Sequence, residues 1–366
     1  MALRLLVGTK QGLYTFTSKD RERWTRAGPY LKEWDVPDVA VSDGTAYAAV
    51  DNRKANFGQL VGTVFTAKGH FTAWKKTGLV SLWPHLFTLA AAGRRLYAGF
   101  EPVSLGRSTD GGRTWLEVGS LRSVPGTFEW WGPAEGARCF VSSIIVDRKN
   151  GKRLWVGSSG GGLWRTEDAC RTWQSASWKI REDSGGPGLN KYGDSQLDIH
   201  VARGHPRNPD VVYMGNHPHV RASTNGGRSW RIAEAGLPEC RGDRKQDSYK
   251  APVIRSLALH PRDGRRAFTV PLTWSRQGVP ALKGQLGVGR TSDGGRHWEV
   301  IEKGLPTYKD ANTFRHCMDA DDGNPVGVYF GTREGDLFAS GDEGDSWVRV
   351  AKGLPPIRSV RVTGTP

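Results

Sequence analysis

Arginine and histidine side chains occupy one aligned position in several short apolar segments of the chain. Two of these segments closely match each other and read Val253-Ile254-Arg255-Ser256-Leu257-Ala258-Leu259 and Pro356-Ile357-Arg358-Ser359-Val360-Arg361-Val362. In the other segments the same position holds His316, His200, Ser142 and His85, and in one it is ambiguous between Pro37 and Asp38. A guanidinium group donates two parallel hydrogen bonds to a carboxylate or phosphate, and histidine exchanges protons near neutral pH. The pattern therefore predicts an anion-binding site with acid–base chemistry.

These residues have different expected roles. Arg255, His316 and Arg358 would form an arc around an anion if their segments are neighbours in space. The candidates for general acid and base are His200, His316 and Glu101. The candidates for contacting the ligand are Arg255, Arg358, His85, His217, Asp38, Trp130, Trp131 and Tyr249. A structural alternative stays open, because the same arginines and histidines could pair with Asp or Glu as buried links.

Two further patterns bear on the ligand. The run Phe128-Glu129-Trp130-Trp131 could stack on a ring or on the face of a sugar, or it could pack its own loop down. His85, His200 and His217 could instead hold a divalent metal as neutral imidazoles. The cysteines have no spacing typical of a metal site, and they are Cys139, Cys170, Cys240 and Cys317. The sequence therefore leaves the cofactor unknown, with a divalent metal as one alternative.

A short turn that ends in tryptophan recurs along the chain and must position these residues. The clean copies run from Ser108 to Trp115, from Ser223 to Trp230, from Thr291 to Trp298 and from Ser340 to Trp347. A looser copy ends at Trp173 and two worn ones end at Trp24 and Trp74, so the tryptophans are 50, 41, 58, 57, 68 and 49 residues apart. Asp or Asn in the turn can accept backbone N–H groups, and paired glycines supply positive φ angles. The spacing is typical of solenoids, arrays and propellers.

This turn resembles the Asp-box, or BNR, repeat of sialidase-like β-propellers. The whole chain is similar to bacterial single-domain Asp-box proteins described as sialidase-like or glycosyl-hydrolase-like. Those begin with a phrase like Val7-Gly8-Thr9-Lys10-Gln11-Gly12-Leu13 and end with phrases like Gly327 to Thr332 and Asp342 to Trp347. The resemblance implies the fold, with the turn as a structural brace of each blade. Sialidases also have an Arg-Ile-Pro motif, which this chain lacks, and a Tyr–Glu pair, which cannot be assigned here beyond Tyr249 as a loose candidate. These departures argue against sialidase activity.

A second repeated phrase, with Tyr97-Ala98-Gly99 as one copy, precedes each turn and reads as a buried strand. Counting these phrases predicts an all-β fold, a seven-bladed β-propeller of four-stranded antiparallel blades. The first phrase has no innermost strand before it, and the C-terminal segment supplies one. The first blade would then consist of residues 4–28 plus 356–363, and residues 1–366 would form a single domain. A ring closed in this way leaves no exposed sheet edge at the junction.

The two faces of such a ring differ. The repeated turns are short, whereas the connections of the opposite face are long and irregular, as in 120–138, 179–196, 238–251 and 304–314. Binding residues usually lie on long loops that a rigid scaffold positions. We therefore expect the site at the mouth of the central channel on the face away from the repeated turns.

The net charge and the lengths of the apolar runs bear on the partner and the cellular compartment that we expect. The formal net charge is +15, but the same slot of the turn holds Arg113, Arg171, Arg228 and Arg296, and no run of basic residues with interleaved aromatics occurs. This distribution argues against nucleic acid as the partner. The apolar run at the N-terminus is too short for a signal peptide, and no run could span a membrane. We expect a cytoplasmic protein with reduced thiols.

Two functions fit these patterns. The first is an enzyme, a hydrolase or lyase of glycosyl-hydrolase-like type, that acts on a small anionic or carbohydrate-like molecule at the mouth of the channel. The second is a non-catalytic ligand-binding or protein-interaction scaffold. The resemblance makes the second a real rival, since Asp-box propellers include photosystem assembly factors. The sequence does not decide the oligomeric state.

Overall fold

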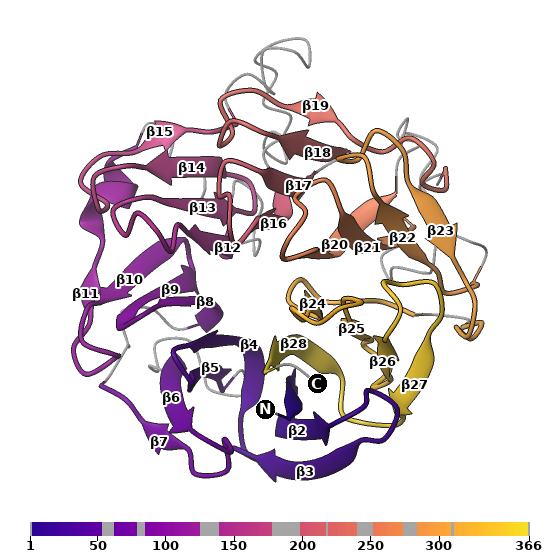
Figure 1. Cartoon of the computed structure of the whole chain (residues 1–366). Helices are drawn as coiled ribbons and strands as arrows, with labels where there is room; N and C mark the ends of the chain where they lie inside the picture. Colours follow the sequence, from indigo (N-terminus) through magenta and orange to yellow (C-terminus); the bar gives the residue numbers. More distant parts are fainter. Residues whose placement is uncertain are drawn as a thin grey trace.

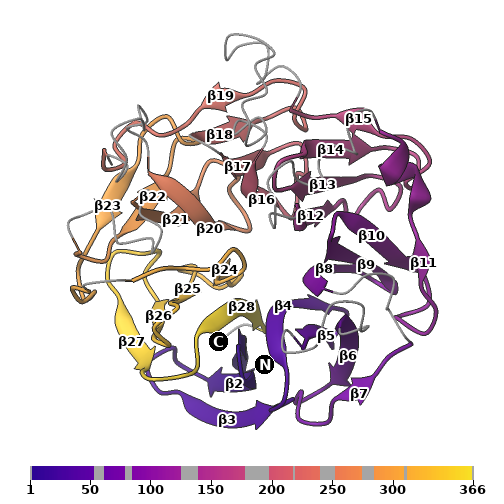
Figure 2. The ribbon, with the colours of Figure 1, turned by 180° about the vertical axis from the view of Figure 1, so that it is seen from behind.

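The computed structural model describes residues 2–52, 62–78, 85–124, 139–177, 198–216, 219–239, 252–273, 284–308 and 311–364. Seven antiparallel sheets of four strands each stand around a central axis, as Figure 1 shows from one side and Figure 2 from the other. The fold is therefore a seven-bladed β-propeller closed by the C-terminal strand, as the sequence predicts.

Each sheet is one blade, whose strands succeed one another outward from the central channel. From the innermost strand to the outermost, blade one consists of β28 (Ile357–Thr363), β1 (Leu3–Thr9), β2 (Gly12–Ser18) and β3 (Thr25–Tyr30). Blade two consists of β4 (Asp35–Ser42), β5 (Thr45–Asp51), β6 (Gly62–Lys68) and β7 (Lys75–Lys76). Blade three consists of β8 (His85–Ala92), β9 (Arg95–Glu101), β10 (Ser104–Ser108) and β11 (Leu116–Glu117). Blade four consists of β12 (Val141–Val146), β13 (Leu154–Ser158), β14 (Gly162–Thr166) and β15 (Gln174–Ser175).

The remaining blades follow the same order. Blade five consists of β16 (Ile199–Gly204), β17 (Val212–Asn216), β18 (Val220–Ser223) and β19 (Arg231–Ile232). Blade six consists of β20 (Val253–Leu259), β21 (Ala267–Leu272), β22 (Val288–Thr291) and β23 (Glu299–Ile301). Blade seven consists of β24 (Met318–Ala320), β25 (Val328–Gly331), β26 (Leu337–Ser340) and β27 (Val348–Ala351). A 3-10 helix, η1 (Gly119–Ser123), follows β11.

In the part of the chain that the structure describes, no helix has the length and apolar character needed to cross a bilayer.

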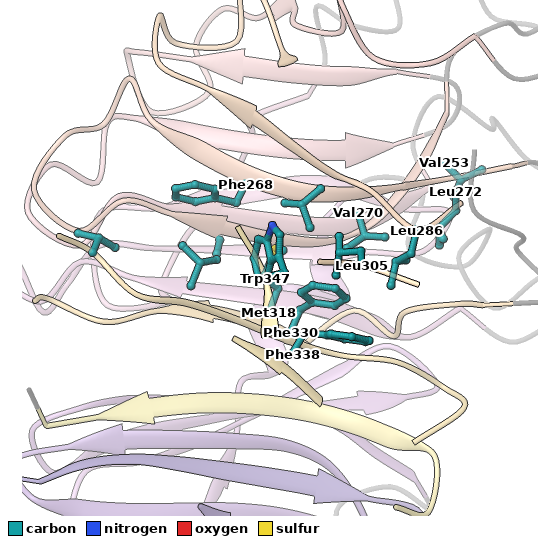
Figure 3. Packing of buried hydrophobic residues seen from close by; sticks show 14 residues of the cluster. Val253, Phe268, Val270, Leu272, Leu286, Leu305, Met318, Phe330, Phe338 and Trp347 are labelled. Atoms are coloured by element: carbon teal, nitrogen blue, oxygen red, sulfur yellow. The ribbon is translucent and has the colours of Figure 1, made fainter. Parts of the chain in front are cut away.

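The hydrophobic core lies between the blades. Seven clusters of buried side chains fill the seven junctions, and each cluster joins residues of two neighbouring blades. Figure 3 shows the junction of blades six and seven, where Trp347 packs against Phe330 with ring centroids 5.1 Å apart. Because each blade buries both of its faces against neighbours, the ring needs all seven blades to complete its core.

The glycine in the second-strand phrase marks the closest approach of two blades. A Cβ at Gly331 of β25 would lie 2.4 Å from Cγ2 of Ile357, and one at Gly8 of β1 would lie 2.5 Å from the carbonyl oxygen of Val36. Ile357 and Val36 belong to the innermost strands of the next blades. A side chain at these positions would push the next blade away, which explains why the repeated phrase carries glycine.

The repeated turn has the predicted hydrogen bonds. In the copy of blade three, Oδ1 of Asp110 accepts the N–H groups of Arg113 and Thr114 at 2.9 and 3.0 Å. Oγ of Ser108 accepts the N–H of Gly112 at 2.9 Å, and that glycine has a φ of 90°. Indole Nε1 of Trp115 donates to the carbonyl of Gly112 at 3.1 Å. The turn therefore satisfies its own backbone, and the tryptophan stands one residue before the outermost strand.

Strand β28 closes the ring. It pairs antiparallel with β1, so that Leu5 faces Val362 and Val7 faces Val360. On its other side, the N–H of Val360 donates to the carbonyl of His316 in blade seven at 2.8 Å. Ile357 and Val360 are fully buried in the junction of blades seven and one. The first and last segments of the chain therefore form one blade, with both termini beside it (Figure 1).

Deleting residues 355–366 should destabilise the whole ring. The deletion removes the buried side chains of Ile357 and Val360 and leaves the inner edge of β1 unpaired. Each fully buried aliphatic side chain contributes roughly 1.5–3 kcal/mol, so the loss of these two alone should lower the melting temperature by about 4–8 °C. Differential scanning calorimetry measures it, with deletion of residues 365–366 as the control. An unchanged melting temperature in the longer deletion would contradict closure by β28.

Candidate functional site

The faces of the propeller are defined by the connections between strands. The turns between first and second strands and the repeated turns between third and fourth strands lie on one side, which we call the turn face. The opposite side, the loop face, carries the connections between second and third strands and between blades. Four predicted ligand-contacting residues lie outside the described residues, and they are Trp130, Trp131, His217 and Tyr249.

The aligned position of Arg255 and Arg358 is a bulge at the loop-face end of the innermost strands. In six blades the pairing of first and second strands shifts there and leaves a residue unpaired. In blade three this residue is Phe87, because His85 pairs with Glu101 before the shift. In blade two Pro37 lies in the shift, whereas Asp38 pairs with Ala49 beyond it. The alignment of the sequence therefore misplaced His85 by two residues, because the residue of blade three that corresponds to His200 and Arg358 is Phe87.

Two predicted ligand-binding arginines flank the segment that leads into blade seven. Nη1 of Arg255 donates to Oδ1 of Asn312 over 3.4 Å, and its Nε is buried without a hydrogen-bond partner in the described residues. The guanidinium of Arg358 lies 4.4 Å from the ring centre of Phe314, and its Nε donates to Oδ1 of Asp35 at 3.1 Å. Arg333 lies over the same ring at 5.9 Å. Three guanidinium groups therefore gather at this side of the loop-face mouth.

His200 stands on the neighbouring blade with a carboxylate beside it. Its Nε2 lies 3.4 Å from Oδ2 of Asp198, and the ring is buried. Burial lowers the pKa of His200, Asp198 raises it, and the charges of Arg315 and Arg255 lower it further. Burial also lowers the pKa of Arg255, against the effect of the same Asp198 carboxylate. The imidazole of His200 is therefore neutral at pH 7 and stands within the field of both an acid and an arginine.

Glu101 and His85 meet at the far side of the mouth. They face each other at the ends of β9 and β8, and Nδ1 of His85 lies 3.3 Å from both carboxylate oxygens of Asp51. Burial raises the pKa of the Cys139 thiol to about 11, and the negative charges of Asp198 and Glu101 both add to this rise. The two carboxylates therefore act on one thiol between blades three and five. Half-buried phenyl rings line the same region, with Phe87 stacked on Phe140 at 4.2 Å.

His316 and Asp38 lie deeper in the channel and belong to a different cluster. Nη2 of Arg203 donates to Nδ1 of His316 at 3.2 Å, and that nitrogen lies 3.7 Å from Oδ2 of Asp38. Nη2 of Arg361 donates to Oδ1 of Asp38 at 3.1 Å, and its Nη1 lies 3.7 Å from Oδ2 of Asp319. We call these five residues the channel network. They come from blades five, seven, two and one, so the expected arc of Arg255, His316 and Arg358 divides between two clusters.

The channel network holds a neutral histidine among ions. Oδ2 of Asp38 also accepts Oγ1–H of Thr88 at 3.0 Å and the N–H of Leu89 at 2.9 Å. Burial alone would raise the pKa of Asp38, but His316, Arg361 and Arg203 lower it below its ordinary value. Burial lowers the pKa of His316 to about 3. For Asp38 and His316, these are the contacts that the structural alternative predicts.

The sequence alignment missed part of this network. Three positions beyond the bulge, the innermost strands carry Ala40, Ala90, Ile145, Arg203, Ala258, Asp319 and Arg361, and each pairs with the same slot of the second strand. Three charged residues in a ring of small or apolar ones were a detectable signal. Asp198 was harder to find, because it precedes β16 and has no aligned counterpart.

The described cysteines and histidines do not come together as a reactive thiol centre or as a metal site. Cys139, Cys170 and Cys317 are free thiols there, and burial raises the pKa of the latter two to about 12. Among the residues that the structure describes, no three side chains of His, Cys, Asp or Glu gather as a metal site. His85 and His200 have separate carboxylate partners, and His217 lies outside the described residues.

Comparison with known proteins supports the fold alone. No family model and no curated protein matches the chain. An ancestral GH74 enzyme superposes with a TM-score of 0.57 at 16% identity over 87% of this chain, which spans 38% of that enzyme. A putative 6-phosphogluconolactonase from Bacteroides fragilis gives 0.58 at 11% identity, over 99% of this chain and 98% of that one. YCF48 bound to a D1 peptide gives 0.52 at 13% identity, over 93% and 87%.

Stability should fall as the pH is lowered, and His316 should account for part of the fall. Its folded pKa of about 3 lies below the ordinary value of 6.5, so between these values the unfolded chain binds the proton more readily. The loss begins below pH 6.5 and is at most about 1.4 kcal/mol per pH unit for this group.

Replacing His316 by Asn removes this titration. Urea unfolding at several pH values should give a shallower slope of unfolding free energy between pH 6.5 and 4 than in the unchanged protein. The exposed residue His297 offers the control, His297→Asn, which should keep the original slope. Equal slopes in all three proteins would show that His316 does not titrate as its burial implies.

Proposed function

We propose that the loop-face mouth binds a small anionic or sugar-like molecule and that the protein acts on it as a hydrolase or lyase. The proposal rests on the hydrogen bonding of Arg255. Its guanidinium makes one long hydrogen bond of 3.4 Å to Asn312 and keeps a buried Nε–H without a partner in the described residues. A buried donor that is left unpaired costs free energy, and a ligand carboxylate or phosphate would satisfy it.

The neighbours of Arg255 suit a sugar acid or a similar molecule. Arg358 and Arg333 add positive charge around Phe314, and Arg358 itself is held by Asp35. The phenyl rings of Phe87, Phe140 and Phe314 are half-buried and add apolar surface to the mouth, where Phe87 and Phe140 stack on each other and the two arginines lie over Phe314. Carbohydrate rings pack on aromatic faces while their polar groups bond to charged side chains. Asp38 and the four candidates outside the described residues remain predictions as ligand contacts.

In this proposal His200 is the proton acceptor. Burial and the neighbouring arginines keep it neutral, and Asp198 stabilises the imidazolium that forms when it takes a proton. Glu101 would be the complementary acid or base, since its charge and that of Asp198 reach the same thiol of Cys139. His316 remains a candidate whose ring faces Asp38 and Arg203 rather than His200.

Arg255→Gln and His200→Ala separate binding from turnover. With 4-nitrophenyl glycuronides as probes, Arg255→Gln should raise KM at least about tenfold, because a charge-assisted hydrogen bond contributes roughly 1.5–3 kcal/mol. His200→Ala should lower kcat about a hundredfold or more while binding is retained. Release of nitrophenol and calorimetric titration with glucuronate measure the two effects.

Arg113→Gln is the matched control, because Arg113 is exposed in a repeated turn on the opposite face. It should leave KM and kcat unchanged. If neither probe nor glucuronate binds the unchanged protein, or if Arg255→Gln behaves like this control, the site assignment is wrong.

A non-catalytic scaffold is the second candidate. A propeller of the same fold, YCF48, has been solved with a peptide bound, so the fold serves binding as well as hydrolysis. Binding of glucuronate without turnover of any glycuronide, together with loss of binding in Arg255→Gln, would favour this candidate over the enzyme.

A further inference from the structure

A second opening of the channel lies on the turn face, away from the proposed loop-face site. A cavity of about 1130 Å³ is bordered there by turns between first and second strands. Six arginines line it, and they are Arg94, Arg95, Arg148, Arg203, Arg207 and Arg361. They come from blades one, three, four and five, so the positive charge converges from several sides of the ring.

The carboxylates at this cavity do not balance the arginines. Asp322 is shared by Arg207 at 3.0 Å and Arg262 at 3.4 Å. Oδ2 of Asp319 accepts the backbone N–H of Val362 and faces Arg361. Asp43 is the third carboxylate in the lining, which leaves six arginines against three acids.

The arginines of blades three and four have no acidic partner within the described ranges. Arg94 donates to the backbone carbonyl of Asp110 at 3.2 Å. Arg95 and Arg148 form no ion pair with any carboxylate of those ranges. All three side chains are exposed at the rim of the cavity and can turn toward a ligand.

The inner end of the cavity carries charges of both signs. Arg203 and Arg361 line it and belong to the channel network, where both are half-buried. Burial and the charge of Arg361 lower the pKa of Arg203 to about 10. Asp38 and Asp319 compensate these two guanidinium groups, so the unbalanced positive charge of the cavity lies at its rim.

We propose that the turn-face cavity is a second, independent site that binds a small molecule carrying two or more phosphate or carboxylate groups. Its volume of about 1130 Å³ lies just above the range of about 300–1,000 Å³ that small-molecule sites commonly occupy. Guanidinium groups bind phosphate and carboxylate through paired hydrogen bonds, and several of them on a rigid ring suit a ligand with several anionic groups. This site would lie at the opposite end of the channel from the mouth where the sequence places the expected site.

Pyrophosphate and citrate are the probes, titrated calorimetrically at about 0.1 M ionic strength. We expect one saturable site per chain. Arg94→Gln combined with Arg148→Gln should raise the Kd about tenfold or more for either probe, since two charge-assisted contacts are lost. Arg148→Lys keeps the charge and should lose less affinity than Arg148→Gln, because lysine cannot form the paired hydrogen bonds.

The control is Arg113→Gln combined with Arg171→Gln, which removes the same charge from exposed repeated turns outside the cavity. It should leave the Kd within about twofold, because surface charges act weakly at this ionic strength. Arg255→Gln combined with Arg358→Gln should also leave it unchanged, which separates this site from the loop-face site. Several weak equivalents per chain, no saturable binding, or equal losses in the cavity and control variants would overturn the proposal. Melting curves confirm that each variant is folded.

Discussion

The closure of the ring by β28 is the constraint on which the rest of the structure depends. Every blade buries both faces against its neighbours, so an open ring would expose two apolar faces at once. Pairing of the last strand with β1 completes the first blade and with it the junction of blades seven and one. It also fixes the seven innermost strands around the channel, and it therefore sets the positions of all the charged side chains that reach the channel.

The polar side chains of the channel network also connect the closing strand to other blades. Arg361 lies on β28, and its guanidinium bonds Asp38 of blade two and faces Asp319 of blade seven. Arg203 reaches from blade five to His316. A buried charge is stable only when opposite charges and hydrogen bonds compensate it, so these side chains favour one register of the closing strand over others. The network thus links the correct closure of the ring to the chemistry of its channel.

The sequence was sufficient for the fold because the pattern repeats. Seven tryptophan turns and seven second-strand phrases set the blades, and the match of residues 253–259 to 356–362 revealed the closing strand. The site was harder, because its contacts do not repeat. The aligned position of blade three holds Phe87 rather than His85, and Asp198 has no counterpart in other blades. Side chains that cross the channel, such as Arg203 to His316, join blades far apart in sequence, and no local pattern records such a contact.

The two ends of the channel have different charge, and the channel network separates them. At the loop face, the arginines of blades six, seven and one lie near carboxylates that include Asp35, Asp198 and Glu334, so that mouth carries charges of both signs. At the turn face, arginines without acidic partners in the described ranges dominate the rim. Because the repeat makes backbone positions equivalent, it does not by itself require the exposed arginines Arg94, Arg95 and Arg148 at this rim. Selection for a ligand is the simplest physical reason to keep unbalanced arginines at one opening, where each adds repulsion that folding must overcome.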